Sequence, residues 1–550
     1  RLIRRQRQMC IRDRKNYNRS GHELFNHYTY AIVSDGDLQE GIASEAASLA
    51  GTLQLEKLIY LYDDNGISIE GSTDITFTEN VHHRFQAYGW HVIGPIDGMS
   101  VASVDQALRM AQATRNQPTL IICRTVIGYG SPNKAGTASA HGEPLGEEEV
   151  RLAKEKLGWT YEEPFTVPPE VRAHLSQAQE RGREYQEKWQ AKLESYRQAY
   201  PDEAKQLEDG LAGNLPEGWA SDLANLFKGV DKPIATRAAS GQIMNAITPE
   251  VHNLMGGSAD LAPSTKTILK DGGDFGANNY SGRNLHFGVR EHAMGGIANG
   301  LALHGGIIPY VATFLVFSDY MRPSIRLAAM MGIRVIYIFS HDSIGLGEDG
   351  PTHQPVEQLK GLRSIPGLTV IRPADATETA EAWKIALQRH DGPTVLVLTR
   401  QNVPVLDREV LSPAGGVRYG GYTLRAAAAS PDVILIGTGS EVHIALEAGK
   451  LLQEKGVTAR IVSLPAWELF DVQPEEYRNS VLLPGVPRIS IEAGITLGWE
   501  RYTGSNGIAI GLSRFGASAP GKVIYEKLGL TCLLYTSPSP RDLSTSRMPS

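Results

Sequence analysis

The sequence predicts an α/β fold of three consecutive domains, each with a mainly parallel sheet covered by helices. Strand-like apolar runs alternate with helical segments along most of the chain, and such alternation favours parallel sheets. A length of 550 residues suits several domains. Hydrophobic residues make up 41% and charged residues 21% of the chain, as in ordinary globular proteins. A largely disordered or fibrous protein is therefore excluded.

The first strand–helix–strand unit is the clearest one. A strand at 29–33 precedes a helical stretch at 40–53 and a second apolar strand that ends at Asp63. Strand-like runs recur at five further places: 119–124, 335–339, 394–398, 433–436 and 460–464. This order predicts repeated βαβ units.

The segment 165–230 is different, because it is charged and helical. It carries an aromatic and apolar stripe with spacings of 4, 4, 3 and 4 residues: Tyr185, Trp189, Leu193, Tyr196 and Tyr200. Such residues share one helix face. We interpret the stripe as the packing of a linker helix onto a neighbouring domain, with an aromatic cofactor site as the alternative.

The two ends differ in composition from the body. Residues 1–14 contain six Arg and one Asp, and residues 532–550 are rich in Ser and Pro. We predict that both ends are non-native or disordered. Only Cys123 lies between them, so a disulfide framework is excluded and a reducing, cytoplasmic location is expected. The net charge of −7 argues against a nucleic acid partner, and no apolar run is long enough to cross a membrane.

Polar clusters follow the first two strands. The first is SDGD at 34–37 and the second is DDNG at 63–66, so both should lie at the carboxyl edge of the sheet, where such sheets bind ligands. Asp35 and Asn65 offer hard oxygen ligands for Mg²⁺ or Ca²⁺, and Gly36 allows a ligand to approach the backbone. Either cluster alone is best explained as an acidic turn, whereas the pair predicts a cation-bridged diphosphate.

This arrangement resembles the thiamine diphosphate fold of transketolases, through the match of SDGDLQEG at 34–41 and YDDNGISIEG at 62–71. The resemblance implies thiamine diphosphate as cofactor and Asp35 and Asn65 as side-chain metal ligands. It also implies Ile67 as a carbonyl ligand and places Gly36 near the diphosphate. Ser34 replaces the first glycine of the family signature.

Two further motifs resemble the part of the family fold that holds the pyrimidine ring. GVREHAMGGIANG at 288–300 begins a small-residue helix with Glu291, which the resemblance assigns to the ring nitrogen of the cofactor's aminopyrimidine. TFLVFSDY at 313–320 supplies three aromatic residues that are implied to wall that ring: Phe314, Phe317 and Tyr320. Taken alone, Glu291 is better explained as an ordinary helix-start glutamate, and the three aromatic residues are better explained by core packing.

The most specific motif is HDSIGLGEDGPTHQP at 341–355, whose glycines and histidines suit a polar loop beside a ligand. In the family, His353 approaches the cofactor amine and the substrate. Asp349 contacts a sugar hydroxyl, and His341 helps to bind the substrate phosphate. This motif narrows the resemblance from thiamine enzymes in general to transketolases.

Further residues match the family's substrate-binding positions. Arg237, Ser264 and Arg400, together with His341, are implied to bind phosphate, a role for which bidentate Arg is suited. His141 matches a histidine near the diphosphate and the reacting carbons, so the implied catalytic residues are Glu291, His141, His341 and His353. The turn GTGSE at 437–441 could form a phosphate loop, although the resemblance places no catalytic residue there.

The resemblance extends from about residue 15 to 531 and implies the domain limits. These are a diphosphate- and metal-binding domain at 15–164, a helical linker at 165–230, a pyrimidine-binding domain at 231–410 and a transketolase C-terminal domain at 411–531. Because the metal ligands and Glu291 fall in different domains, the family relationship implies a homodimer with active sites at the subunit interface. Closure within one chain is the alternative.

The implied function is the reversible transfer of a two-carbon ketol unit from a ketose phosphate, such as xylulose 5-phosphate, to an aldose phosphate, such as ribose 5-phosphate. Two related enzymes share the cofactor: dihydroxyacetone synthase and 1-deoxyxylulose 5-phosphate synthase. A non-catalytic, transketolase-like interaction protein is a third alternative. The family segment that precedes the first motif is absent from this sequence, and the C-terminal domain stops early. We therefore expect the chain as given to be weakly active or inactive.

Overall fold

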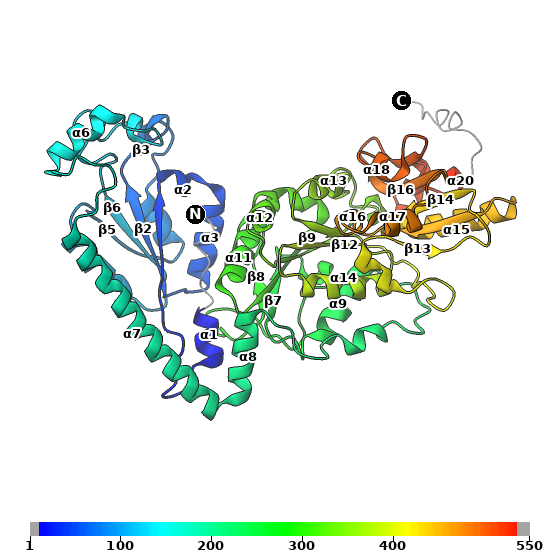
Figure 1. Ribbon diagram of the computed structural model, residues 1–550, viewed down its shortest axis with the longest axis horizontal. Coiled ribbons are helices and arrows are strands. Elements are labelled where there is room, and N and C mark those ends of the chain that lie inside the picture. The colour runs from blue at the N-terminus through cyan, green and yellow to red at the C-terminus, as the bar shows by residue number, and fades with distance from the viewer. Residues whose placement is uncertain (1–9, 536–550) are drawn as a thin grey trace. The chain divides into compact units, whose positions relative to one another are not determined.

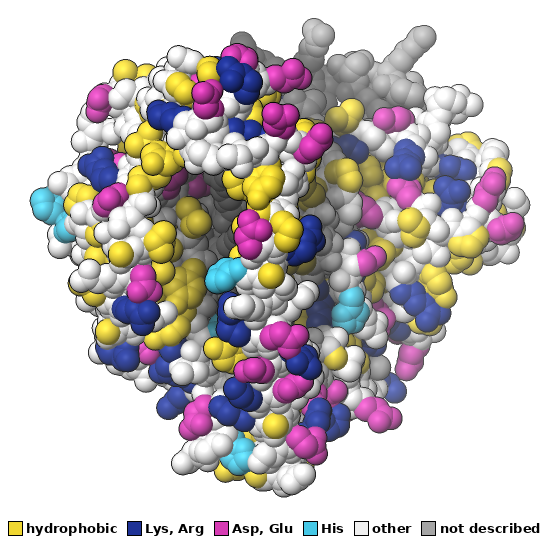
Figure 2. Space-filling model, turned by 60° about the vertical axis from the view of Figure 1, so that its left-hand side comes forward, with side chains coloured by type: hydrophobic (Ala, Val, Ile, Leu, Met, Phe, Trp, Pro, Cys, Tyr) yellow, Lys and Arg dark blue, Asp and Glu magenta, His cyan; other side chains and the backbone are white. Residues whose placement is uncertain are grey.

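The computed structural model describes residues 10–535, and the chain forms two compact units (Figure 1). Unit 1 extends to Glu208 and includes Phe275–Ser281. Unit 2 comprises Asp209–Asp274 and the chain from Gly282 onward. Figure 2 shows basic and acidic side chains interspersed over the face that it presents. Among the described residues, no helix combines the length and the apolar character that a membrane span requires.

Unit 1 contains a parallel four-stranded sheet in the order β1-β2-β6-β5. Its strands are β1 (Thr29–Ser34), β2 (Leu58–Asp64), β5 (His91–Asp97) and β6 (Thr119–Arg124). The helices that connect them are α2 (Asp35–Gln39), α3 (Gly41–Thr52), α4 (Val81–Ala87) and α5 (Val101–Ala113). A short hairpin of β3 (Ile67–Ser68) and β4 (Gly71–Ser72) follows β2. The sheet brings the ends of β1 and β2 together, since Ser34 pairs with Asp63.

The helical segment consists of α6 (Glu147–Lys156), α7 (Pro169–Ala199) and α8 (Pro201–Ala212), and it belongs to unit 1 as far as Glu208. Leu193 and Tyr196 of α7 are buried in a cluster with Leu24 and Phe25, and the Trp189 indole N–H donates to the Leu24 carbonyl at 3.0 Å. The packing interpretation of the stripe is therefore confirmed for its central residues. Its first member, Tyr185, is exposed.

Unit 2 contains a parallel six-stranded sheet in the order β11-β12-β10-β9-β7-β8. The strands are β7 (Leu254–Ser258), β8 (Asn284–His286), β9 (Ile308–Phe314), β10 (Ile336–Ser340), β11 (Thr369–Ile371) and β12 (Thr394–Leu398). Helix α9 (Thr236–Ile247) packs with α14 (Ala376–Gln388), and α11 (Glu291–His304) packs with α12 (Ser318–Met330). These two pairs cover the two faces of the sheet (Figure 1), so β9, β10 and β12 are buried along their whole length.

A five-stranded sheet completes unit 2 in the order β13-β15-β14-β16-β17. It is formed by β13 (Tyr422–Arg425), β14 (Val433–Gly437), β15 (Ala459–Ser463), β16 (Arg488–Ile495) and β17 (Ile508–Leu512). Only the β13–β15 pair is antiparallel. The flanking helices include α15 (Glu441–Glu454), α16 (Trp467–Asp471), α17 (Glu475–Val481), α18 (Glu500–Thr503), α19 (Gly521–Lys527) and α20 (Cys532–Tyr535). The predicted class of helix-covered, mainly parallel sheets is confirmed.

The structure corrects three predictions about local order. Residues 10–14, predicted to be non-native or disordered, are ordered and lie in helix α1 (Cys10–Tyr17), where Ile11 and Arg12 are buried. Residues 532–535, predicted to belong to a non-native or disordered tail, are ordered in α20; the remaining terminal residues lie outside the described part. The turn predicted after β1 is the short helix α2, which a capping box between Ser34 and Asp37 stabilises.

Candidate active site

Asp35 begins α2 at the carboxyl end of β1 and is 2% exposed. Its Oδ1 accepts a hydrogen bond from the Tyr62 hydroxyl, whereas its buried Oδ2 has no hydrogen-bond partner among the described residues. Burial raises the pKa of Asp35, and the hydrogen bonds from Tyr62 and Gly66 oppose this shift. A buried carboxylate oxygen without a partner is costly unless a cation or donor meets it, so the side chain fits a metal ligand.

Asn65 follows β2, and its side chain forms hydrogen bonds within its own loop. Its Oδ1 accepts from the Ile67 backbone N–H at 3.0 Å, and its Nδ2 donates to Asp63 Oδ2 at 3.3 Å. Among the described residues, no cluster of three or more His, Cys, Asp and Glu side chains could hold a metal ion. An amide oxygen and a backbone carbonyl beside one carboxylate would suit a hard cation that also binds phosphate oxygens.

Gly36 is open to a ligand. A Cβ built at this position would meet no atom of the chain within 4 Å, so internal packing does not require a glycine there. The close approach of a ligand to the backbone would require one.

Three residues near Asp35 were given no role of their own from the sequence: Tyr62, Asp64 and Arg124. Tyr62 donates to Asp35 from within β2. Arg124, at the end of β6, pairs with Asp64 at 3.2 Å. Burial raises the pKa of Asp64, and Arg124 opposes the shift. The sequence offered one signal for the Asp64–Arg124 pair, namely their positions. Asp64 and Arg124 are the last residues of neighbouring strands and are paired in the sheet register.

His141 follows a 3₁₀ turn at Ala138–Ala140 in unit 1. Its ring is half-buried, and Nδ1 is a buried atom with no hydrogen-bond partner among the described residues. The next residue, Gly142, has φ +78°, which a glycine adopts without steric cost. The histidine therefore has a ring nitrogen available for a ligand.

In unit 2, the carboxyl ends of three adjacent strands bring predicted residues together. Ser340, the last residue of β10, pairs with Phe314 of β9 and with Leu398 of β12. His341 therefore follows the central strand of the three, between Phe314 and Arg400. The parallel register explains why residues far apart in the sequence meet at one sheet edge.

Aromatic rings line this edge. The ring of Phe314 stacks on His341 with a centroid distance of 3.6 Å and an interplanar angle of 28°. Phe317 lies 5.8 Å from Phe314 and 5.5 Å from His353 between ring centroids. Tyr320 stacks at 6.1 Å from Phe317 and is 64% exposed. The rings form a wall that is buried at Phe314 and open at Tyr320.

Two arginines and a neutral histidine form a positive cluster beside the wall. Burial, followed by the charges of Arg237, Arg400 and His353, lowers the pKa of His341 to about 3. Burial and then Arg400 lower the pKa of Arg237. Arg237 Nη1 also donates to the Ser264 carbonyl at 2.7 Å. Cations that disfavour one another in this way attract an anion.

The remaining predicted residues, Glu291 and Asp349, also lie in unit 2. Glu291 is the first residue of α11 and is half-buried. Asp349 is exposed in the loop before His353. The backbone N–H of His353 donates to the Gly350 carbonyl at 3.0 Å. The roles of these two residues stay predictions.

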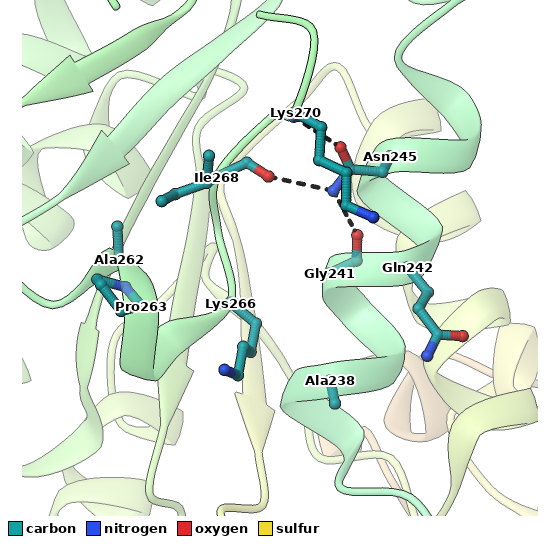
Figure 3. A pocket seen from close by; sticks show the side chains of 9 residues that line it. All are labelled: Ala238, Gly241, Gln242, Asn245, Ala262, Pro263, Lys266, Ile268 and Lys270. Atoms are coloured by element: carbon teal, nitrogen blue, oxygen red, sulfur yellow. Dashed lines mark hydrogen bonds between the residues drawn. The ribbon is translucent and has the colours of Figure 1, made fainter.

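A cavity of about 440 Å³ lies beside α9 (Figure 3). One of its polar lining side chains, Asn245, donates to the carbonyls of Gly241 and Ile268 and accepts from the Lys270 N–H. These bonds satisfy Asn245 within the chain and connect α9 to the segment after α10 (Ala262–Thr265). We therefore interpret Asn245 as structural.

Three family models match the chain. They describe a transketolase thiamine diphosphate binding domain at residues 6–216, a transketolase pyrimidine binding domain at 232–405 and a transketolase-like C-terminal domain at 420–531. The fold and these matches define a class, the thiamine diphosphate-binding enzymes.

Comparison with individual proteins is more specific. The chain is 52% identical over 518 residues to a transketolase of Geobacillus stearothermophilus, covering 94% of this chain and 77% of that one. It is similar to solved transketolases of Leishmania mexicana, at 42% identity and a TM-score of 0.93, and of Pichia stipitis with sedoheptulose 7-phosphate, at 40% and 0.93. Each comparison covers 99% of this chain and 80% of the solved one. The chain therefore belongs to the transketolase family, transferases that move a two-carbon ketol unit between sugar phosphates.

Proposed function

We propose that the chain performs this transfer with thiamine diphosphate and a divalent cation, Mg²⁺ or alternatively Ca²⁺. Asp35 and Asn65 would bind the cation through their side chains and Ile67 through its carbonyl, with Gly36 beside the diphosphate. The buried, unpartnered Oδ2 of Asp35 supports this assignment. When bound, thiamine diphosphate supplies the electron sink for breaking the carbon–carbon bond of the donor.

The observation that carries the proposal is the positive cluster of Arg237, His341 and Arg400. The Ser340 Oγ lies 2.9 Å from Nδ1 of His341, so we assign Nε2 to the substrate phosphate. A neutral imidazole donates one hydrogen bond there, and the two guanidinium groups supply charge and bidentate donors. Ser264 completes the proposed phosphate site.

The aromatic wall is assigned to the cofactor's pyrimidine ring. Phe314, Phe317 and Tyr320 would exclude water from it and orient it. Glu291, at the start of α11, would hold a proton at the ring nitrogen. Family membership supports this role, because the transketolase pyrimidine binding domain matches the region that contains all four residues.

Two histidines are assigned to proton movement at the substrate. Thr352 Oγ1 lies 2.9 Å from Nδ1 of His353, so Nε2 is the ring nitrogen that we assign to substrate hydroxyls. His141 would serve the reacting carbons through its unpartnered Nδ1. Asp349 would accept a hydrogen bond from a sugar hydroxyl.

We also propose a homodimer with active sites at the subunit interface, which membership of the family supports. Sedimentation at twice the chain mass of 59.9 kDa is the expected result. The cytoplasmic location stays a prediction from cysteine usage, and relatives similar to this chain include chloroplastic transketolases of Craterostigma plantagineum and Arabidopsis thaliana.

The direct test is ketol transfer from xylulose 5-phosphate to ribose 5-phosphate with thiamine diphosphate and Mg²⁺. We expect a seven-carbon ketose phosphate and a three-carbon aldose phosphate as products. Formaldehyde as acceptor, or pyruvate with glyceraldehyde phosphate, would reveal the two related enzymes. The rate of this transfer tests the expectation of weak activity, and cofactor titration of the same preparation separates a chain that only binds the cofactor from one that also catalyses transfer. A chain that binds neither cofactor nor sugar phosphate would contradict the proposal.

A further inference from the structure

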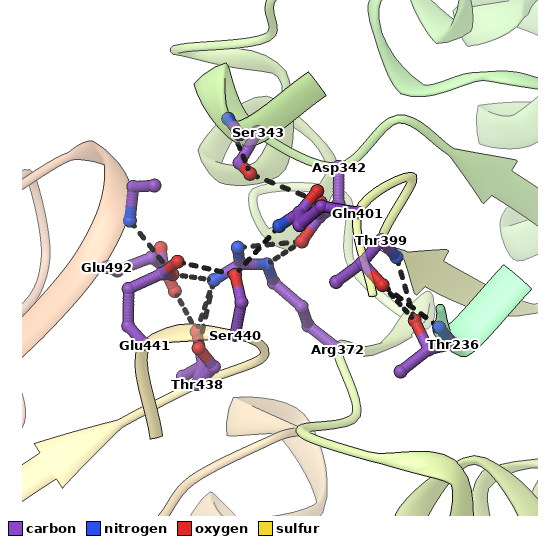
Figure 4. Close-up of polar contacts among 12 residues, drawn as sticks. Thr236, Asp342, Ser343, Arg372, Thr399, Gln401, Thr438, Ser440, Glu441 and Glu492 are labelled. Carbon is purple, nitrogen blue, oxygen red and sulfur yellow. Dashed lines mark hydrogen bonds and ion pairs between the residues drawn. The ribbon is translucent and has the colours of Figure 1, made fainter. Parts of the chain in front are cut away.

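The residue after His341 belongs to a buried ionic network within unit 2 (Figure 4). Asp342 has a fully buried side chain, and its Oδ2 accepts from Arg372 Nε at 3.0 Å and Nη2 at 2.7 Å. Arg372 follows β11 and is also buried, with its side chain 1% exposed. Two charge-assisted hydrogen bonds from one guanidinium group to the same carboxylate oxygen fix both side chains. The backbone that carries His341 is therefore held by an arginine 31 positions away in the sequence.

The other side of Arg372 contacts the turn at 437–441. Its Nη1 donates to the Thr438 carbonyl at 3.0 Å and to Thr438 Oγ1 at 3.1 Å, and it forms a buried ion pair with Glu441. Glu441 in turn accepts from the Tyr525 hydroxyl at 2.7 Å and from the Ala493 N–H at 3.0 Å. One guanidinium group thus connects the end of β10 to the five-stranded sheet.

One glycine of this turn, Gly439, is explained by the same contact. Gly439 has φ +53°, and a Cβ there would lie 2.7 Å from the guanidinium carbon of Arg372. Its N–H donates to the Arg372 carbonyl at 3.1 Å. With its polar groups engaged by Arg372 and a buried Glu441 carboxylate beside it, the turn is unsuited to phosphate, and the phosphate-loop alternative is wrong.

The geometry of His341 makes it sensitive to this support. Its φ is +60°, a left-handed backbone conformation that costs a non-glycine residue free energy and persists only where surrounding contacts enforce it. Phe314 stacks on one face of the ring, but ring stacking does not fix the backbone. Asp342 is the adjacent residue with the strongest contacts, and those contacts lead to Arg372.

We propose that Arg372 is a positioning residue for the phosphate site, holding His341 in its left-handed conformation through the Asp342–Arg372–Glu441 network. The inference rests on the proposed role of His341 in phosphate binding. It gives the turn at 437–441, which holds no predicted site residue, a function in substrate affinity.

The test is the Asp342→Asn variant, which keeps the size of the side chain and leaves Arg372 paired with Glu441. We expect the Kd of ribose 5-phosphate, measured by calorimetry on the full chain, to rise about tenfold, because a misplaced hydrogen-bond donor loses most of its contribution. The Kd of thiamine diphosphate with Mg²⁺ should stay unchanged. A general loss of stability would instead change the Kd values of both ligands together.

The matched control is Asp375→Asn, which removes a carboxylate with a fully buried side chain that pairs with Arg408 at 3.1 Å elsewhere in unit 2. This variant should lower the unfolding midpoint without changing the Kd of ribose 5-phosphate. If Asp342→Asn folds poorly, the triple variant Arg372→Met, Asp342→Asn, Glu441→Gln replaces the charges together, which buried networks often tolerate. It should recover stability and still bind ribose 5-phosphate weakly.

Two results would overturn the inference, and they differ in what else they overturn. Wild-type affinity for ribose 5-phosphate in a folded Asp342→Asn or triple variant would exclude positioning and leave the proposed function intact. If the wild-type chain binds cofactor but has no affinity for ribose 5-phosphate, the phosphate assignment itself fails, and the positioning role fails with it.

Discussion

The strands that precede the two groups of site residues are buried to different extents. In β1 of unit 1, buried and exposed residues alternate, and Ile32 is 74% exposed. In β9 and β10 of unit 2, every residue is buried. A half-covered strand has few neighbours to fix the turn that follows it, whereas a fully covered sheet can hold its edge through packing on both faces.

The site residues follow the same difference. In unit 1, Asp35 is held by Tyr62, and Asn65 is held by its own turn. In unit 2, the ring of His341 stacks on Phe314, and the next residue, Asp342, forms a buried ion pair. We infer that unit 1 supplies oxygen ligands that a cation completes, while unit 2 supplies a site that is arranged before ligands bind. Changes in unit 1 should therefore affect cofactor retention, and changes in unit 2 should affect reactivity and phosphate binding.

The largest expected effect is that of Glu291→Gln in unit 2. Loss of the carboxylic acid at the ring nitrogen should slow proton exchange at the reactive thiazolium carbon by about 10²–10⁴-fold. The Kd of thiamine diphosphate should change little. Deuterium exchange of the bound cofactor, followed by NMR, measures this rate without any substrate.

The control for this variant is Glu475→Gln, which changes an exposed glutamate that begins α17 as Glu291 begins α11. It alters the same helix-dipole interaction and should leave the exchange rate unchanged. Equal exchange rates in Glu291→Gln and the wild type would remove Glu291 from the proposed mechanism.

Asp35→Asn in unit 1 should have the opposite effect to Glu291→Gln, because it should weaken cofactor binding. We expect the Kd of thiamine diphosphate with Mg²⁺ to rise about 100-fold, because a ligand charge is removed. Burial raises the pKa of Asp35, so its carboxylate costs stability as pH rises through that pKa. At pH 7 the variant should therefore be more stable than the wild type when Mg²⁺ is absent.

Thermal unfolding with and without Mg²⁺ measures both parts of this prediction. Asp105→Asn is the control, since Asp105 lies on α5 of the same unit in an exposed pair with Arg109. It should lower neither cofactor affinity nor the gain in stability from Mg²⁺. Retained affinity in Asp35→Asn would contradict the metal assignment.

The sequence predicted much of the fold because apolar β-branched runs mark strands. The predicted bounds at 119–124 and 394–398 agree with β6 and β12. Strand β7 was missed because its sequence, LMGGS, has little strand character. Its glycines are explained by packing, since a Cβ at Gly256 would lie 1.8 Å from the Tyr310 carbonyl oxygen and one at Gly257 would lie 1.7 Å from that of Leu285.

The site was predictable where a motif names the residue and not where tertiary contact defines it. His341 and Phe314 lie within motifs, and the sheet register brings them together. Arg372 lies in the run VIRPAD, in which nothing distinguishes it from a surface arginine. Its role depends on Asp342 and Glu441, which are distant in sequence. The domain limits and the individual roles of the site residues stay predictions.

The smallest expected effect concerns the pH dependence that His341 imposes on unit 2. Its pKa in the folded protein is about 3, below the value of about 6.5 for an unfolded chain. Between these values the unfolded state binds more protons, so stability falls as pH is lowered through this window. From pH 7 to pH 5 this group should lower the free energy of unfolding by about 2 kcal/mol.

His341→Gln should remove that part of the decline in stability, measured as the free energy of urea unfolding at both pH values. The exposed His174, replaced in the same way, should leave the decline unchanged. If the free energy of unfolding of the variant falls between pH 7 and pH 5 as steeply as that of the wild type, His341 is not held neutral. The main electrostatic evidence for a prearranged phosphate site in unit 2 would then be lost.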